Sequence, residues 1–162
     1  MPVVVQLAPY EIRMAVAVGT ERAMQSIIGK IGDRHICRQD WERWGYDIEA
    51  AAAEVAVAKH LGMFFDGSVN TFKRSDLGTQ WEVRHTRHPQ GHLIIRREDP
   101  TYSTYILVVG LVPRMTVCGW IKGIDGKSPK HWCEMPPPAA WFVKQIDLYP
   151  IDTIETRGVT HE

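Results

Sequence analysis

The sequence contains no long hydrophobic run and no excess of charge of either sign. No apolar stretch reaches the roughly 18 residues that a transmembrane helix requires, so we expect no membrane span. The opening residues M-P-V-V-V-Q-L lack the charged and long apolar segments of a signal peptide, and we expect none. Lysine plus arginine and aspartate plus glutamate each number 19, which gives a formal net charge of +0. Any nucleic-acid binding must therefore use a local basic patch.

Cysteine is scarce, and two common catalytic motifs are missing. The three cysteines, Cys37, Cys118 and Cys133, are scattered along the chain. This argues against a disulfide framework and favours a reducing, cytoplasmic setting. The chain contains no G-x-x-x-x-G-K followed by Ser or Thr, and no G-x-S-x-G. A P-loop motif and a nucleophile-elbow motif are therefore excluded.

The apolar fraction of 44% in a chain of 162 residues is sufficient for one compact domain with its own core. The order of the patterns predicts an α/β (α+β) fold, in which N-terminal helices pack on a mixed, mainly antiparallel sheet of about four strands. We expect a single domain over 1–162 with four consecutive parts. These are a helical part at 9–62, a sheet carrying the candidate site at 64–121, a Pro/Gly-rich segment with a short helix at 122–152, and a polar tail at 153–162.

Two helices are predicted in the N-terminal part. Apolar residues recur at three- and four-residue steps from Pro9 to about Lys30, and a second helix runs from Asp40 to Gly62. The second helix carries the run A-A-A-A-E-V-A-V-A, whose small side chains let a helix lie close against a sheet. Glu54 stands within this run. It is either a solvated surface carboxylate or one that points along the sheet toward the site.

Short β-branched and apolar runs follow the helices. The segment Gln80–Thr86 turns at Pro89–Gly91 into His92–Arg97, which predicts a β-hairpin. A central strand buried on both faces is expected at Tyr105–Gly110. A further strand at Met115–Ile121 continues the series, so we predict a meander of three or four strands.

The two ends of the chain carry weaker signals. Pro2–Gln6 is a short β-branched run that is either an edge strand or an ordered tail. Ala139–Leu148 predicts a short helix whose apolar residues pack inward.

Acidic and basic residues meet at the first strand of this series. Asp76 precedes the strand, and Glu82 and Arg84 stand two residues apart, so both lie on one face. Three carboxylates could meet at this site, and their hard oxygens are the ligands that Mg²⁺ or Mn²⁺ takes. They belong to Glu54, Asp76 and Glu82. A metal held there lowers the pKa of its water and neutralises charge on a phosphodiester, while Arg84 can hold the phosphate. The pattern therefore predicts a metal-dependent site that cleaves phosphodiester bonds.

The most basic stretch of this neutral chain surrounds the predicted site. One interpretation is that it contacts the phosphates of DNA in a salt-dependent manner. The other is a solvated hairpin whose arginines pair with Glu98, Asp99 and Asp76, and the sequence leaves both open. The predicted nucleic-acid-binding residues are Lys73, Arg74, His85, Arg87, His88, Arg96 and Arg97, and His92 belongs to the same stretch.

Three short motifs resemble the core of the PD-(D/E)XK nuclease superfamily, which has the restriction-endonuclease-like fold. They are E-V-A-V-A-K at 54–59, D-L-G at 76–78 and W-E-V-R at 81–84. Between Ala50 and Leu148 the chain is also similar to small phage and prophage proteins of that type, in G-S-V-N-T-F, V-R-H-T, H-L-I-I-R, V-C-G-W-I and P-P-A-A-W-F-V-K-Q. The resemblance implies that Asp76 is the central metal ligand and Glu82 the second. The resemblance also implies that Glu54, an acidic residue on the second predicted helix, binds the metal or orients a water molecule.

Two features depart from the superfamily pattern. Arg84 stands where the superfamily has lysine, and an arginine cannot lose its proton to act as a general base. Either the metal alone activates the attacking water, or the site only binds. Pro113 joins the last two predicted strands by a tight connection, where the superfamily usually has a helix.

These observations support two hypotheses about function. The first is a phage-encoded, Mg²⁺- or Mn²⁺-dependent nuclease that hydrolyses DNA phosphodiester bonds in the host cytoplasm, as an endonuclease or an exonuclease. The alternative is a catalytically inactive nuclease-fold module that binds DNA or a host protein. Many enzymes of this fold pair up to cut two strands, so a homodimer is compatible with the first hypothesis. No membrane partner is expected.

Overall fold

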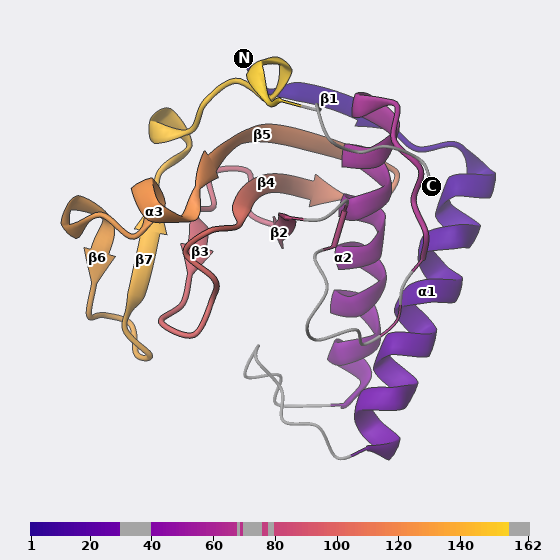
Figure 1. Cartoon of the computed structure of the whole chain (residues 1–162). Helices are drawn as coiled ribbons and strands as arrows, with labels where there is room; N and C mark the ends of the chain where they lie inside the picture. The colour runs from indigo at the N-terminus through magenta and orange to yellow at the C-terminus, as the bar shows by residue number, and fades with distance from the viewer. Residues whose placement is uncertain (30–39, 68, 70–75, 78–79, 156–162) are drawn as a thin grey trace.

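The computed structural model describes residues 1–29, 40–67, 69, 76–77 and 80–155 (Figure 1). Two long helices lie on one side of a four-stranded sheet, and a three-stranded sheet packs on its other side. The predicted α+β class, with N-terminal helices on a mixed sheet, is confirmed. Within this described part of the chain, no helix is long and apolar enough to cross a membrane.

Helix α1 (Pro9–Ile28) packs against helix α2 (Asp40–Leu61), which lies between α1 and the main sheet (Figure 1). Small residues set the distance between the helices. Gly19 lies so close to α2 that a Cβ added there would come within 2.4 Å of the Ile48 Cα. The alanines one turn before and after Gly19 are completely buried. A row of small residues at four-residue spacing thus forms the contact face of α1.

The start of α1 is tied to the end of α2. The Glu11 carboxylate accepts the backbone N–H of Ala8 at 2.6 Å, which closes the first turn behind Pro9. Lys59 Nζ donates to the same carboxylate at 2.7 Å and to the carbonyl of Gln6 at 2.8 Å. These hydrogen bonds therefore join the two helices to each other and to the first strand.

The main sheet has the strand order β1-β5-β4-β2, from β1 (Val3–Gln6) through β5 (Arg114–Lys122) and β4 (Thr104–Leu111) to β2 (Trp81–Thr86). The β1–β5 and β5–β4 pairs are antiparallel, and the β4–β2 pair is parallel. β4 is buried along most of its length, as predicted for the central strand. The N-terminal run that the sequence left open forms an edge strand. α2 covers one face of this sheet, where its alanines pack against alternate residues of β4.

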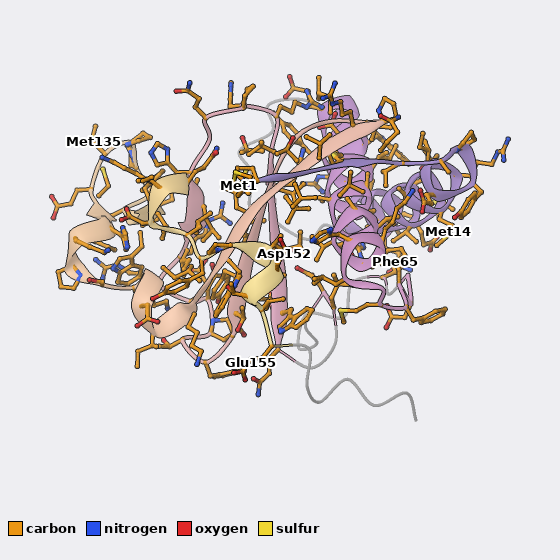
Figure 2. The ribbon with its side chains drawn as sticks, turned by 90° about the horizontal axis from the view of Figure 1, so that it is seen from above. Met1, Met14, Phe65, Met135, Asp152 and Glu155 are labelled. Carbon is orange, nitrogen blue, oxygen red and sulfur yellow. The ribbon has the colours of Figure 1, made fainter. Side chains whose placement is uncertain are left out.

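The small sheet packs on the opposite face of the main sheet. It consists of β3 (Leu93–Ile95), β7 (Ala140–Val143) and β6 (Trp132–Cys133), and both pairs are antiparallel. Its inward side chains join the other alternate residues of β4 in a second core. Met135, in the loop between β6 and β7, lies at the opposite end of the molecule from Met14 of α1 (Figure 2).

Short helices complete the C-terminal part. They are α3 (Gly123–Gly126) and the 3₁₀ helices η1 (Pro129–His131), η2 (Gln145–Asp147) and η3 (Ile151–Thr153). The indole N–H of Trp120 in β5 donates to the carbonyl just before η3 at 3.1 Å. Such contacts hold the Pro/Gly-rich segment against the main sheet.

Three sequence predictions about this part of the chain are wrong. The strands form no meander, because β2 pairs in parallel with β4 and β3 belongs to the small sheet. β2 and β3 form no hairpin ladder, because β2 pairs with β4 and β3 pairs with β7. Gln145 holds the turn between them instead, since its Nε2 donates to the carbonyls of Pro89 at 2.8 Å and Gly91 at 3.0 Å. The helix predicted at Ala139–Leu148 is β7 followed by η2, because its apolar residues pair with β3. The expected tight connection at Pro113 does join β4 to β5.

Candidate functional site

A cleft of about 550 Å³ opens beside α2, β2 and the small sheet. Its lining combines carboxylates, guanidinium groups, imidazoles and a few apolar side chains. The described residues that line it are Tyr46, Ala50, Glu54, Asp76, Val83, Arg84, His85, Thr86, Arg87, His88, Gly91, His92, Ile94, Arg96, Asp99 and Phe142. Most of the site residues predicted from the sequence therefore lie around one cleft.

Glu54 is buried in the middle of α2, where Arg22 of α1 binds it. Its Oε1 lies 2.6 Å from Arg22 Nη1 and its Oε2 lies 2.8 Å from Nη2, so the guanidinium holds both oxygens. Glu54 is 4% exposed, which excludes the solvated alternative. Burial raises the pKa of Glu54 to about 7, against the lowering effect of Arg22, and the charges of Asp76 and Asp66 add to the rise. Glu54 and Asp76 are therefore electrostatically coupled.

Asp76 lies against the outer edge of β2. Its Oδ2 accepts the backbone N–H of Val83 at 2.7 Å. The backbone of Leu77 bonds to that of Trp81 in both directions, at 3.2 and 3.3 Å, which turns the chain back along β2. β2 is an edge strand, so its outer N–H groups can bond to a side-chain acceptor. The edge position therefore fixes Asp76 beside the cleft.

Arg84 is oriented by a buried carboxylate. Its Nη2 lies 3.1 Å from Asp99 Oδ2, its Nη1 lies 3.9 Å from Glu82 Oε2, and its guanidinium carbon is 5.3 Å from the Tyr105 ring centroid. Asp99 is buried, and its Oδ2 also accepts the backbone N–H of Arg96 at 2.8 Å. Asp99 thus closes a turn and positions Arg84. The sequence had suggested it only as a partner of arginines on a solvated hairpin.

Glu82 is not among the described residues that line the cleft. It shares a face of β2 with Arg84, as the alternation predicts, and is the register partner of Tyr105 on the side of the second core. Glu54 approaches from α2, which covers the opposite face. The three predicted carboxylates are therefore divided, with Glu54 near Asp76 and Glu82 near Arg84.

Two further basic residues are tied to neighbouring elements. Burial lowers the pKa of His85, so the neutral imidazole predominates at pH 7, and its Nε2 lies 2.9 Å from the carbonyl oxygen of Gly110. Arg87 Nε donates to Glu49 Oε2 at 2.6 Å, and its guanidinium carbon lies 4.8 Å from the Tyr46 ring centroid. Both side chains keep fixed positions at the cleft.

The other predicted basic residues have different positions. His88 and Arg96 line the cleft. Arg97 is not among the described lining residues, and its guanidinium carbon lies 4.8 Å from the Trp132 ring centroid. Lys73 and Arg74 fall outside the residues that the structure describes.

Tyr46, Phe142 and Asp99 line the cleft although the sequence patterns did not single them out as site residues. A signal for Tyr46 was present, because it stands two helical turns before Glu54 with Ala50 between them. Residues at four-residue steps share a helix face. Phe142 had no such signal, since its segment was predicted to be a helix.

The described residues of the cleft provide some, but not all, of the ligands that a divalent metal needs. Mg²⁺ is usually held by one or two protein carboxylates, and water molecules complete its shell. Glu54 and Asp76 offer such oxygens at the cleft, although Arg22 holds both oxygens of Glu54. Across the described ranges, no three His, Cys, Asp or Glu side chains form a group that could hold a metal ion. A metal in this cleft would therefore have two carboxylate ligands, with water and phosphate oxygens as the others.

No known protein family matches this chain, and neither does any curated protein or any solved structure. The resemblance to the PD-(D/E)XK superfamily therefore remains a prediction from short motifs. The function has to be argued from the residues of the cleft.

Proposed function

We propose that this cleft binds the phosphodiester backbone of DNA and hydrolyses it with Mg²⁺ or Mn²⁺. One observation carries the proposal: Glu54 and Asp76 line the same cleft as Arg84. Carboxylates can hold a cation beside a phosphate, and a guanidinium binds phosphate oxygens through a fixed fork of donors. Arg87 and Arg96 extend the basic lining toward the flanking phosphates.

The central groups take separate roles. Asp76 and Glu54 are the residues that would hold the metal, which when bound neutralises phosphate charge and lowers the pKa of its water. Arg84, positioned by Asp99, binds a phosphate oxygen, and its guanidinium stays protonated. If Asp76 holds the metal without Glu54, the Glu54 carboxylate, whose pKa burial raises to about 7, is the group matched to accept the proton of the attacking water.

A second candidate function is DNA or host-protein binding without hydrolysis. The ion pair between Arg22 and Glu54 favours it, because this pair already compensates the charge of a proposed metal ligand. Arg84, in the position where the resemblance implies lysine, favours it as well. In this case Arg22 supplies the positive charge that a metal would otherwise bring.

One experiment separates the two candidates. Plasmid and linear DNA are incubated with the protein in Mg²⁺, in Mn²⁺ and in EDTA, and binding is measured in parallel. Asp76→Asn is the test variant, and Asp125→Asn, on the exposed surface of α3, is the matched control. Metal-dependent cleavage that is lost only in Asp76→Asn supports hydrolysis. DNA binding without cleavage, unchanged by EDTA and by Asp76→Asn, supports the binding module. The absence of both cleavage and DNA binding overturns hydrolysis and DNA binding alike.

A phage origin, a cytoplasmic setting and a homodimer remain predictions from the sequence. The proposed chemistry requires none of them, because all of its groups come from one copy of the chain.

A further inference from the structure

One wall of the cleft is apolar. Ile94 of β3 and Phe142 of β7 are register partners, and both line the cleft. Their neighbours Leu93 and Val143 are completely buried in the second core. Since side chains alternate across a strand, the small sheet directs one face into the core and presents Ile94 and Phe142 on the other. Ile94 is 38% exposed despite its apolar side chain.

A further aromatic ring borders the cleft from α2. Tyr46 is 37% exposed and stacks near the guanidinium of Arg87, which Glu49 holds in place. Figure 1 shows α2 and the small sheet on opposite sides of β2. The cleft therefore combines fixed guanidinium groups with apolar surface contributed by two separate elements.

We infer that the cleft takes a single strand of DNA, with an unpaired base against Phe142 and Ile94 and the adjoining phosphates at Arg84 and Arg87. This inference rests on the proposed function, because it assumes that DNA is the ligand. Aromatic side chains bind nucleic acid by stacking on base faces, while basic groups follow the backbone. A duplex hides its base faces within the stack and offers this wall nothing to contact.

The size of the cleft supports a single strand. A volume of about 550 Å³ falls in the range of sites that take a small molecule, so the cleft has room for one unpaired nucleotide. Isolated apolar side chains on a surface are ordinary. Here the apolar pair lies in the same cleft as Arg84 and Arg96, so phosphate and base contacts can form together.

Fluorescence anisotropy in EDTA tests the inference without hydrolysis. The probes are a labelled oligothymidine of about eight nucleotides, an abasic strand of the same length and charge, and a blunt duplex. We expect oligothymidine to bind about tenfold more tightly than the abasic strand, which is within the effect of one base–aromatic stack. Weaker binding of the duplex than of oligothymidine is also expected.

Variants of the apolar wall locate the base contact. Phe142→Leu keeps an apolar side chain but removes the ring, so it should abolish most of the preference for oligothymidine over the abasic strand. Phe142→Trp keeps a ring and should retain the preference. Ile124→Ala removes an apolar side chain that is 67% exposed outside the cleft, and it should change nothing.

The outcomes separate this inference from the proposed function. Equal binding of the oligothymidine and abasic strands by the unaltered protein overturns the inference, as does duplex binding that equals or exceeds that of oligothymidine. DNA binding as such survives either result if Arg84→Gln still weakens all three probes. If no probe binds in EDTA, this inference fails, whereas the proposed function is decided by the binding and cleavage assays in Mg²⁺ and Mn²⁺.

Discussion

Arg22 on α1 and Glu54 on α2 form a two-pronged ion pair across the helix interface, with nitrogen–oxygen distances of 2.6 and 2.8 Å. The Arg22 side chain is 15% exposed and that of Glu54 is 5% exposed, so both charges are largely removed from water. Losing one partner of such a pair leaves a buried charge without compensation. The same pair determines whether Glu54 is available to a metal, and it therefore links helix packing to the proposed chemistry.

Arg22→Gln is expected to lower the free energy of unfolding by about 3 kcal/mol near pH 8, because it leaves the Glu54 carboxylate buried and unpaired. Burial and the charge of Asp76 raise the pKa of Glu54, so the folded chain takes up a proton there as the pH falls. The loss should therefore shrink below about pH 6. Urea denaturation at both pH values measures it. Arg13→Gln, on the exposed side of α1, is the control, and equal losses for the two variants would contradict the prediction.

The affinity for Mn²⁺ should fall by about tenfold per pH unit below pH 7 and level off above it, because one proton is displaced for each metal bound. Burial raises the pKa of Glu54 to about 7, so its protonated form, which is a poor ligand, predominates below that pH. Isothermal titration calorimetry across this range measures the slope. Glu54→Gln should bind Mn²⁺ more weakly and lose the slope. A slope that persists in this variant would assign the proton to another group.

Arg84→Gln is expected to reduce DNA hydrolysis by about 100-fold, because it removes a charged donor from the phosphate in the transition state. Arg84→Lys keeps a cation and introduces the residue that the resemblance implies, so it should retain most of the rate. Single-turnover cleavage in Mg²⁺ gives both rates. If Arg84→Gln cleaves as fast as the unaltered protein, Arg84 does not act on the phosphate.

Gly19→Ala is expected to lower the free energy of unfolding by about 1–3 kcal/mol, because overpacking forces the helices apart. The added Cβ would lie 2.4 Å from the backbone of Ile48, and a helix backbone, unlike a side chain, cannot change rotamer to avoid it. Gly45→Ala is a matched control within α2, where the nearest atom is the flexible end of Arg87 at 3.1 Å. That variant should be neutral or more stable, since alanine favours a helix over glycine. Comparable losses in urea denaturation for both would show that close packing at Gly19 is not limiting.

The helices and the long strands follow from local sequence patterns. The predicted strands at 80–86 and 105–110 appear as Trp81–Thr86 and Thr104–Leu111, and the two N-terminal helices occupy nearly the expected ranges. Hydrophobic periodicity, capping residues and turn residues act over only a few positions, so they can be recognised directly in the sequence. The same holds for the shared face of Glu82 and Arg84, which depends only on alternation within one strand.

Strand pairing and the partners of the charged groups depended on contacts between distant segments. A turn at Pro89–Gly91 is compatible with a hairpin, but burial of β3 in the second core brings it to β7 instead. The sequence by itself determined which acids and bases the chain offers, among them Glu54 and Arg84. The tertiary structure decided that Glu54 binds Arg22 and that Arg84 binds Asp99. Helix packing and strand order bring these partners together, and no local sequence pattern predicts them.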